Sequence, residues 1–290
     1  MSEPPRAPWP GRRVPPARRD GPSPRGEASA RGESAPRSDS ATRPPRNDDE
    51  LRLFGLNAVR AAFAARPQDL RKLWLLSSRM GDLRDLLAHC VANRRGYTVV
   101  EADELERIAG TQHHEGVVMA VRRPDELNLS SFLRDLPAGP MQLLWLDGIG
   151  NPHNFGAILR SAAHFGVTAV LLPKDSPLAL SGAAVRVAEG GAEAVPLVRL
   201  GRSDNAIAQL RSLGFELVAT VVRDGESLYA RALPERCVWV LGAEGEGLDL
   251  ELAAAATRRL GIPGSGKVES LNVAAATAVL LAEWSRQRSD

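Results

Sequence analysis

The sequence is poor in cysteine and in aromatic residues. It has two cysteines, Cys90 and Cys237, both in apolar stretches, and aromatic residues make up 4% of its 290 residues. Two such distant thiols do not make a disulfide framework, and a zinc site needs four clustered ligands. We therefore expect two buried thiols in a reducing, cytoplasmic compartment and no metal.

Several common functional motifs are also missing. No apolar run approaches the roughly 18 residues needed to span a bilayer, so we expect no membrane partner. The histidines form no H-E-x-x-H pair, and the sequence contains no G-x-G-x-x-G dinucleotide turn. Residues 261–267 spell G-x-x-x-x-G-K, but Val268 follows where a phosphate-binding loop has its Mg²⁺-binding hydroxyl. These absences argue against a metalloprotease, a dinucleotide enzyme and a nucleotide hydrolase.

The first fifty residues differ in composition from the rest. They hold eleven prolines and ten arginines against eight acids, with one aromatic residue, Trp9. Such a segment cannot bury enough apolar surface to offset its ordering entropy, so we predict a disordered tail over 1–50. The tail carries the whole formal charge of +2, which leaves residues 51–290 close to neutral. Its role is either that of a solvated tail or that of a weak RNA-binding arm.

Apolar periodicity divides the remainder into two α/β domains. Residues 51–122 predict a compact α/β unit, and 123–140, with three prolines, predicts a linker. In 141–290, short apolar runs alternate with helical stretches, which predicts a parallel sheet with helices on both faces. The expected strands are 143–146, 169–172, 195–198, 217–222, 238–241 and 260–262, and the clearest helices are 154–165, 204–213 and 271–286.

Three polar segments follow strands of this sheet, where the ligand crevice of a parallel sheet lies. The first runs from Asp147 to Arg160, with Asn154 as the expected helix cap. The second, 241–248, has three glycines, which permit a close backbone approach to a ligand, but its two acids argue against a phosphate cradle. The third, 262–273, has a glycine loop and then Ser270 as the expected cap of the final helix.

Together the three segments resemble the motifs of the SpoU/TrmH family of RNA ribose 2′-O-methyltransferases, part of the knotted SPOUT superfamily. Asn154-Phe-Gly-Ala-Ile-Leu-Arg160 is similar to the first motif, 241–248 to the second, and Ile262-Pro263 with 270–273 to the third. Residues 53–121 resemble the small ribosomal-protein-like RNA-binding domain often fused ahead of it. The sequence departs from the family pattern at Gly264, where methionine is common, and at 188–192, where Ala-Glu-Gly-Gly-Ala replaces Ser-x-Gly-Ala.

The resemblance implies a deep trefoil knot in 141–290 and methyl transfer from S-adenosylmethionine to a ribose 2′-hydroxyl in structured RNA, either tRNA or rRNA. It assigns activation of the hydroxyl, or stabilisation of the alkoxide, to Arg160. The residues that would position the ribose and this arginine are Asn154, Glu244, Ser270 and Asn272. Groups that would hold the cofactor lie at Leu241, Gly242, Gly247, Ile262 and Leu271.

The resemblance also implies a homodimer formed through helices of the knotted domain. The final helix carries Val273, Val279, Leu280 and Trp284, more apolar residues than one small core face needs. Two alternatives to the enzyme stay open. One is a catalytically inactive RNA-binding protein on the same fold, although the motif polar residues are all present. The other is a knotted methyltransferase acting on an RNA base, for which a ribose-activating motif would be superfluous.

Overall fold

The computed structural model describes residues 49–243 and 247–289. Most of the tail expected to be disordered, 1–50, therefore lies outside the described residues, as does Glu244. No described helix combines the length and the hydropathy that a bilayer span requires.

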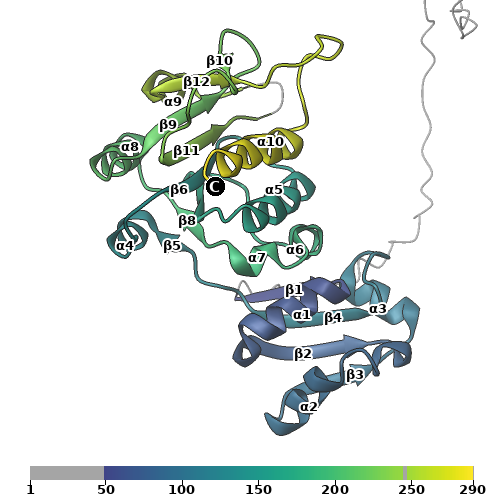
Figure 1. The fold of residues 1–290 in the computed structure, drawn as a ribbon. Coiled ribbons are helices and arrows are strands. Elements are labelled where there is room, and N and C mark those ends of the chain that lie inside the picture. The colour runs from purple at the N-terminus through teal and green to yellow at the C-terminus, as the bar shows by residue number, and fades with distance from the viewer. Residues whose placement is uncertain (1–48, 244–246, 290) are drawn as a thin grey trace, which may run out of the picture. The chain divides into compact units, whose positions relative to one another are not determined.

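Residues 50–122 form a four-stranded sheet in the order β1-β4-β2-β3 (Figure 1). Strand β4 pairs antiparallel with β1 and with β2, and β3 pairs parallel with β2. Helices α1 and α2 bury their apolar sides on one face, and α3 covers the other through Leu105. The elements are β1 (Glu50–Phe54), α1 (Leu56–Ala65), β2 (Leu70–Leu75), α2 (Arg84–Ala92), β3 (Gly96–Val99), α3 (Ala102–Ala109) and β4 (Val117–Arg122).

The rest of the chain forms an eight-stranded sheet in the order β10-β12-β9-β11-β6-β7-β8-β5. Every pairing in it is parallel, as the uninterrupted apolar runs predict. The strands are β5 (Leu127–Asn128), β6 (Met141–Leu146), β7 (Ala169–Leu172), β8 (Leu197–Arg199), β9 (Glu216–Thr220), β10 (Glu226–Ser227), β11 (Arg236–Leu241) and β12 (Arg258–Gly261).

Helices cover both faces of this sheet (Figure 1). Alternate residues of β6, β7, β9 and β11 belong to different core clusters, as the period of two requires. One cluster includes α5 (Pro152–His164), α6 (Gly182–Ala188), α7 (Gly191–Ala194) and α10 (Val273–Arg286). The other includes α4 (Leu129–Arg134), α8 (Ser203–Ser212) and α9 (Leu250–Ala255).

The predicted fold class, α/β with a parallel-sheet domain, is confirmed, and each of the six expected strands overlaps an observed one. The segment 123–140, expected to be a linker, contains β5 and α4, which join the sheet edge and its core. The knot stays a prediction from the resemblance. Cys90 and Cys237 are buried and unpaired, as expected, and burial raises the pKa of both thiols.

Candidate functional site

The candidate site lies where the order of strands in the large sheet reverses. From β6 the chain adds β7 and β8 on one side, and the later strands β9, β11 and β12 lie on the other. Strands β6 and β11 are neighbours that end together, with Leu146 paired to Leu241. Crevices in open parallel sheets form at such a reversal, beyond the carboxyl ends of the strands. The first and second polar segments therefore start side by side.

The first segment turns into α5 through an asparagine cap. Asn151, not Asn154, caps this helix: its Oδ1 accepts from the amides of His153 (2.8 Å) and Asn154 (3.4 Å). Pro152 follows at the first helical position, where its missing N–H costs nothing. The prediction that Asn154 is the cap is therefore wrong. Asn151 thus satisfies the helix end, and the Asn154 side chain contacts other segments.

One partner of the Asn154 side chain comes from the third segment. Asn272, not the predicted Ser270, caps α10, because its Oδ1 accepts from the amides of Ala274 (2.9 Å) and Ala275 (3.4 Å). Its Nδ2 donates to Oδ1 of Asn154 across 3.0 Å. Ser270 is exposed and two residues before the cap. The structure thus brings Asn154 and Asn272 together and leaves Ser270 outside this pair.

The two ends of the second segment, Gly242 and Gly247, approach each other closely where only glycine permits it. A Cβ on Gly242 would collide with the backbone of Gly247, which itself has φ of +78°. Ala243 and Gly247 exchange backbone hydrogen bonds of 3.1 and 3.0 Å across the turn. The amide of Asp249 then donates to the carboxylate of Asp147 (3.0 Å), which ties this turn to the first segment. The Glu244 side chain, a predicted positioning group, lies outside the described residues.

A cavity of about 270 Å³ opens between these segments. Its lining residues are Gly148, Ile149, Gly150, Asn151, Asn154, Ala243 and Val273. None of the residues predicted to hold the cofactor is among these lining residues. Leu241 is buried at the end of β11, Gly242 and Gly247 form the turn, Ile262 is half-buried, and Leu271 is 46% exposed. Ile149, Asn151 and Ala243 were not predicted individually as site residues, although they lie in the first and second polar segments.

Arg160 does not line this cavity of its own chain. It follows Asn154 by six residues on α5, which places it about 120° around the helix and roughly 9 Å along its axis. The arginine is exposed, is not among the lining residues, and forms no hydrogen bond or ion pair with any residue that the structure describes. Its guanidinium is therefore unengaged by described neighbours and faces outward.

A second, larger cleft adjoins the cavity. It has a volume of about 810 Å³ and shares Gly150 with the smaller one. Its walls come mainly from 123–127, from 177–181 and from 192, 193 and 195–197, together with Arg66, Gly150 and Pro152. No group of three or more metal-ligating side chains exists among residues 49–243 and 247–289.

Comparison with known proteins agrees with this geometry. Residues 141–282 match the family described as SpoU rRNA Methylase, and 52–127 match the one described as RNA 2′-O ribose methyltransferase substrate binding. The chain is 37% identical over 239 residues to the uncharacterized tRNA/rRNA methyltransferase YfiF of Escherichia coli O157:H7, covering 82% of this chain and 69% of that protein. It is 33% identical over 241 residues to the 23S rRNA (guanosine-2′-O-)-methyltransferase RlmB of Nitrosomonas europaea, covering 82% and 92%.

A solved structure extends the comparison to the fold. The SpoU methyltransferase AviRb of Streptomyces viridochromogenes, in complex with the cofactor AdoMet, matches with a TM-score of 0.69 at 22% identity. The match covers 83% of this chain and 91% of that one. The resemblance drawn from the three motifs is thus confirmed in sequence and in fold.

Proposed function

This chain belongs to the SpoU rRNA methylase family, and on that premise we propose that it transfers a methyl group from S-adenosylmethionine to a ribose 2′-hydroxyl of ribosomal RNA. The observation that carries the proposal is the hydrogen bond between Asn154 and Asn272 beside the cavity. It joins the first and third motifs near the strand-order reversal. The second motif also begins there, at the end of β11.

The residues present fit the proposed cofactor. The cavity offers aliphatic surface from Ile149 and Val273 and amide groups from Asn151 and Asn154. The absence of a Cβ at Gly242 lets the backbone of Gly247 approach closely, which brings the two ends of the second segment together. When bound, S-adenosylmethionine supplies a methyl group on a sulfonium, so the leaving group is a neutral thioether, which departs readily. The protein must then act on the acceptor.

The acceptor is the harder half of the reaction, because a ribose hydroxyl is a poor nucleophile until its proton is drawn off. We assign Arg160 to the developing alkoxide and the neighbouring phosphate, since a guanidinium stays charged in proteins and binds such oxygens in a two-pronged manner. Asn154 and Asn272, fixed by their mutual bond, orient the ribose. In this assignment the arginine contributes mainly in the transition state.

The larger cleft and the first domain supply the RNA surface. At about 810 Å³ the cleft has the size of a ligand site and reaches the cavity at Gly150, so we assign the target nucleotide to it. On the first domain, the Trp74 ring has Lys72 Nζ 4.9 Å and the Arg52 guanidinium 5.8 Å from its centroid. Such a cationic and aromatic pair suits contact with RNA phosphates and bases.

We further propose that the enzyme is a homodimer, but on different grounds from the apolar surplus of the final helix. Val273, Leu280 and Trp284 are buried in the chain's own core, and Val279 packs against that core. The better argument is Arg160, which is exposed on a different side of α5 from Asn154. A second copy can receive this arginine at its own cavity. Light scattering that shows only monomers at micromolar concentration would exclude this assembly.

The activity is tested by transfer of radiolabelled methyl groups to ribosomal RNA and, separately, to tRNA, followed by digestion to nucleosides. The proposal expects labelled 2′-O-methyl nucleosides from ribosomal RNA. Labelled bases would indicate the base-methylating alternative, label only in tRNA would contradict the substrate, and no label with either RNA would indicate an RNA-binding protein without activity.

A further inference from the structure

The segment 188–194 includes the departure from the family's pattern at 188–192. On one side it touches the RNA-binding domain. Glu189 has φ of +50° and accepts from Nδ2 of Asn57 on α1 at 2.7 Å. Gly190 has φ of +97°, and a Cβ there would come within 3.1 Å of Ala61 Cβ on the same helix. Gly190 therefore permits α7 to lie against α1.

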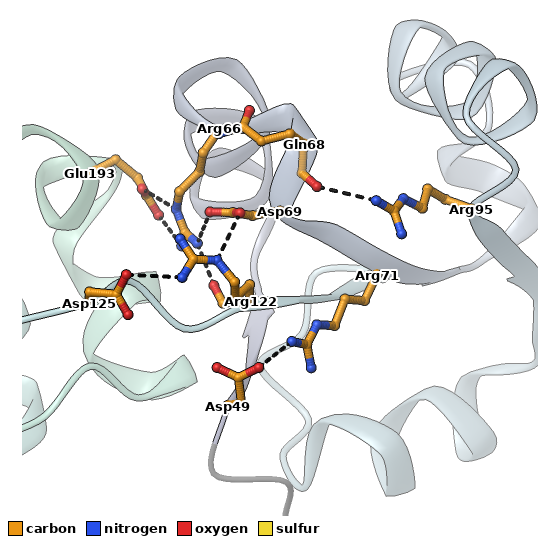
Figure 2. A network of polar contacts seen from close by, with 9 residues as sticks. All are labelled: Asp49, Arg66, Gln68, Asp69, Arg71, Arg95, Arg122, Asp125 and Glu193. Atoms are coloured by element: carbon orange, nitrogen blue, oxygen red, sulfur yellow. Dashed lines mark hydrogen bonds and ion pairs between the residues drawn. The ribbon is translucent and has the colours of Figure 1, made fainter.

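An ion pair anchors α7 to the same helix. Arg66, just after α1, binds Glu193 with both nitrogens, Nε to Oε2 at 2.7 Å and Nη2 to Oε1 at 2.9 Å (Figure 2). The remaining Nη1 donates to Asp69 at 3.4 Å and to the carbonyl of Arg122 at 2.7 Å. The side chains of Arg66 and Glu193 are 10% and 9% exposed. A buried and fully paired arginine of this kind fixes geometry, and removing one partner leaves the other charge buried and unpaired.

The opposite side of the segment lies against α5. A Cβ on Gly191 would stand 2.6 Å from the carbonyl oxygen of Leu159 and 3.0 Å from Cα of Arg160. No side chain fits between α7 and the backbone of the arginine. On the preceding turn, Gly156 makes a similarly close contact with the carbonyl of Ala184 on α6. Because packed interiors transmit displacements, a shift of α7 moves the backbone that carries Arg160.

We propose that Glu193, held by Arg66, is a positioning residue for Arg160, so that docking of the RNA-binding domain sets the orientation of the arginine. This inference rests on the proposed role of Arg160. Glu193 lines the larger cleft, but it touches neither the cavity beside Asn154 nor the arginine's guanidinium. It acts through α7, whose Gly191 lies against the backbone of Arg160.

The test uses Glu193→Gln in the full chain, because glutamine keeps the shape and removes the charge. At saturating RNA and S-adenosylmethionine, we expect the single-turnover rate to fall roughly 10-fold, less than the ~100-fold that a 1 Å misplacement can cost. RNA affinity should stay within about twofold, since glutamine keeps the shape of the cleft wall to which Glu193 contributes. In the Arg160→Ala background the same substitution should have little further effect, because residues that act through one group are non-additive.

A control and a set of contrary outcomes keep the inference separable from the proposed function. The control, Asp82→Asn, removes another ion pair of the RNA-binding domain, the one between Asp82 and Arg79 at 2.9 Å. This pair does not reach α7, so the substitution should leave the rate unchanged. Weaker RNA binding with a normal saturating rate, an unchanged rate, or full additivity with Arg160→Ala would overturn the role of Glu193. Full activity of Arg160→Ala itself would instead overturn the proposed function, and the inference with it.

Discussion

The Nδ2 of Asn272 donates to Oδ1 of Asn154 across 3.0 Å, although 118 residues separate them in the chain. Asn272 uses its other side-chain atom, Oδ1, to cap α10. One amide therefore performs two tasks, and substitutions can separate them. This bond also joins the beginning of α5 to the beginning of α10.

The first prediction exploits that separation. Asn272→Asp keeps an oxygen that accepts the α10 amides but has no hydrogen to donate to Asn154, so we expect near-normal stability and a marked loss of turnover. Asn272→Ala loses both functions and should lower the free energy of unfolding by about 1 kcal/mol as well. Thermal unfolding and methyl transfer on the two variants measure this. Normal turnover in Asn272→Asp would show that the Asn154 contact is structural.

The second prediction concerns Arg160. We expect Arg160→Ala to lower turnover about 10²–10³-fold while the affinity for S-adenosylhomocysteine stays near that of the parent, because the cofactor segments lie elsewhere. Arg160→Lys should recover little, since a compact ammonium cannot reproduce a planar two-pronged contact. Calorimetry and single-turnover transfer measure the two effects. Lost cofactor binding in Arg160→Ala would mark the arginine as structural.

The third prediction concerns the glycine turn. Gly242→Ala places a Cβ against the backbone of Gly247, so the turn must open and cofactor affinity should fall. Gly201→Ala is the matched control, because a Cβ there meets nothing within 4 Å. Calorimetry with S-adenosylhomocysteine should show weakened binding in the first variant alone. Equal affinities in both would indicate that the turn takes no part in the cofactor site.

The fourth prediction concerns pH. Two hydrogen bonds from Arg286, at 2.7 and 2.8 Å, together with one from Gln287, lower the pKa of Glu283 to about 2 from its usual value near 4.5. The folded pKa lies below the unfolded one, so the stabilisation is complete above about pH 4.5 and disappears as the pH falls towards 2. The difference in unfolding free energy between the parent and Glu283→Gln should therefore be constant above pH 5 and shrink below it. A difference independent of pH would contradict the assignment.

Much of the fold could be predicted, because buried parallel strands are apolar runs that glycines and polar residues interrupt. The runs at β6, β7 and β11 are of this kind, and every residue of β6 and β7 is buried. Helix caps were predicted less well. Asn151 and Asn154 are both good caps by type, as are Ser270 and Asn272, and only tertiary contact decides which amide is left for the site.

The sequence did not reveal the elements that hold the site in place. Helices α6 and α7 are short and glycine-bounded, so their periodicity is weak. Glycine is needed at 191 because a Cβ there would meet the backbone of Arg160, 31 positions earlier. The ion-pair partner of Glu193 is Arg66, 127 residues away. Such long-range contacts leave no trace in local spacing. The three motifs could be found because each carries its polar residues together.

The most direct test compares ribosomal RNA from a strain that lacks this chain with RNA from strains that carry the parent or the Arg160→Ala form. Mapping of ribose methylation along each RNA locates the target. The account predicts one 2′-O-methyl nucleotide that is lost in the deletion, restored by the parent and not restored by Arg160→Ala. Identical ribose methylation in all the strains, or full restoration by Arg160→Ala, would contradict it.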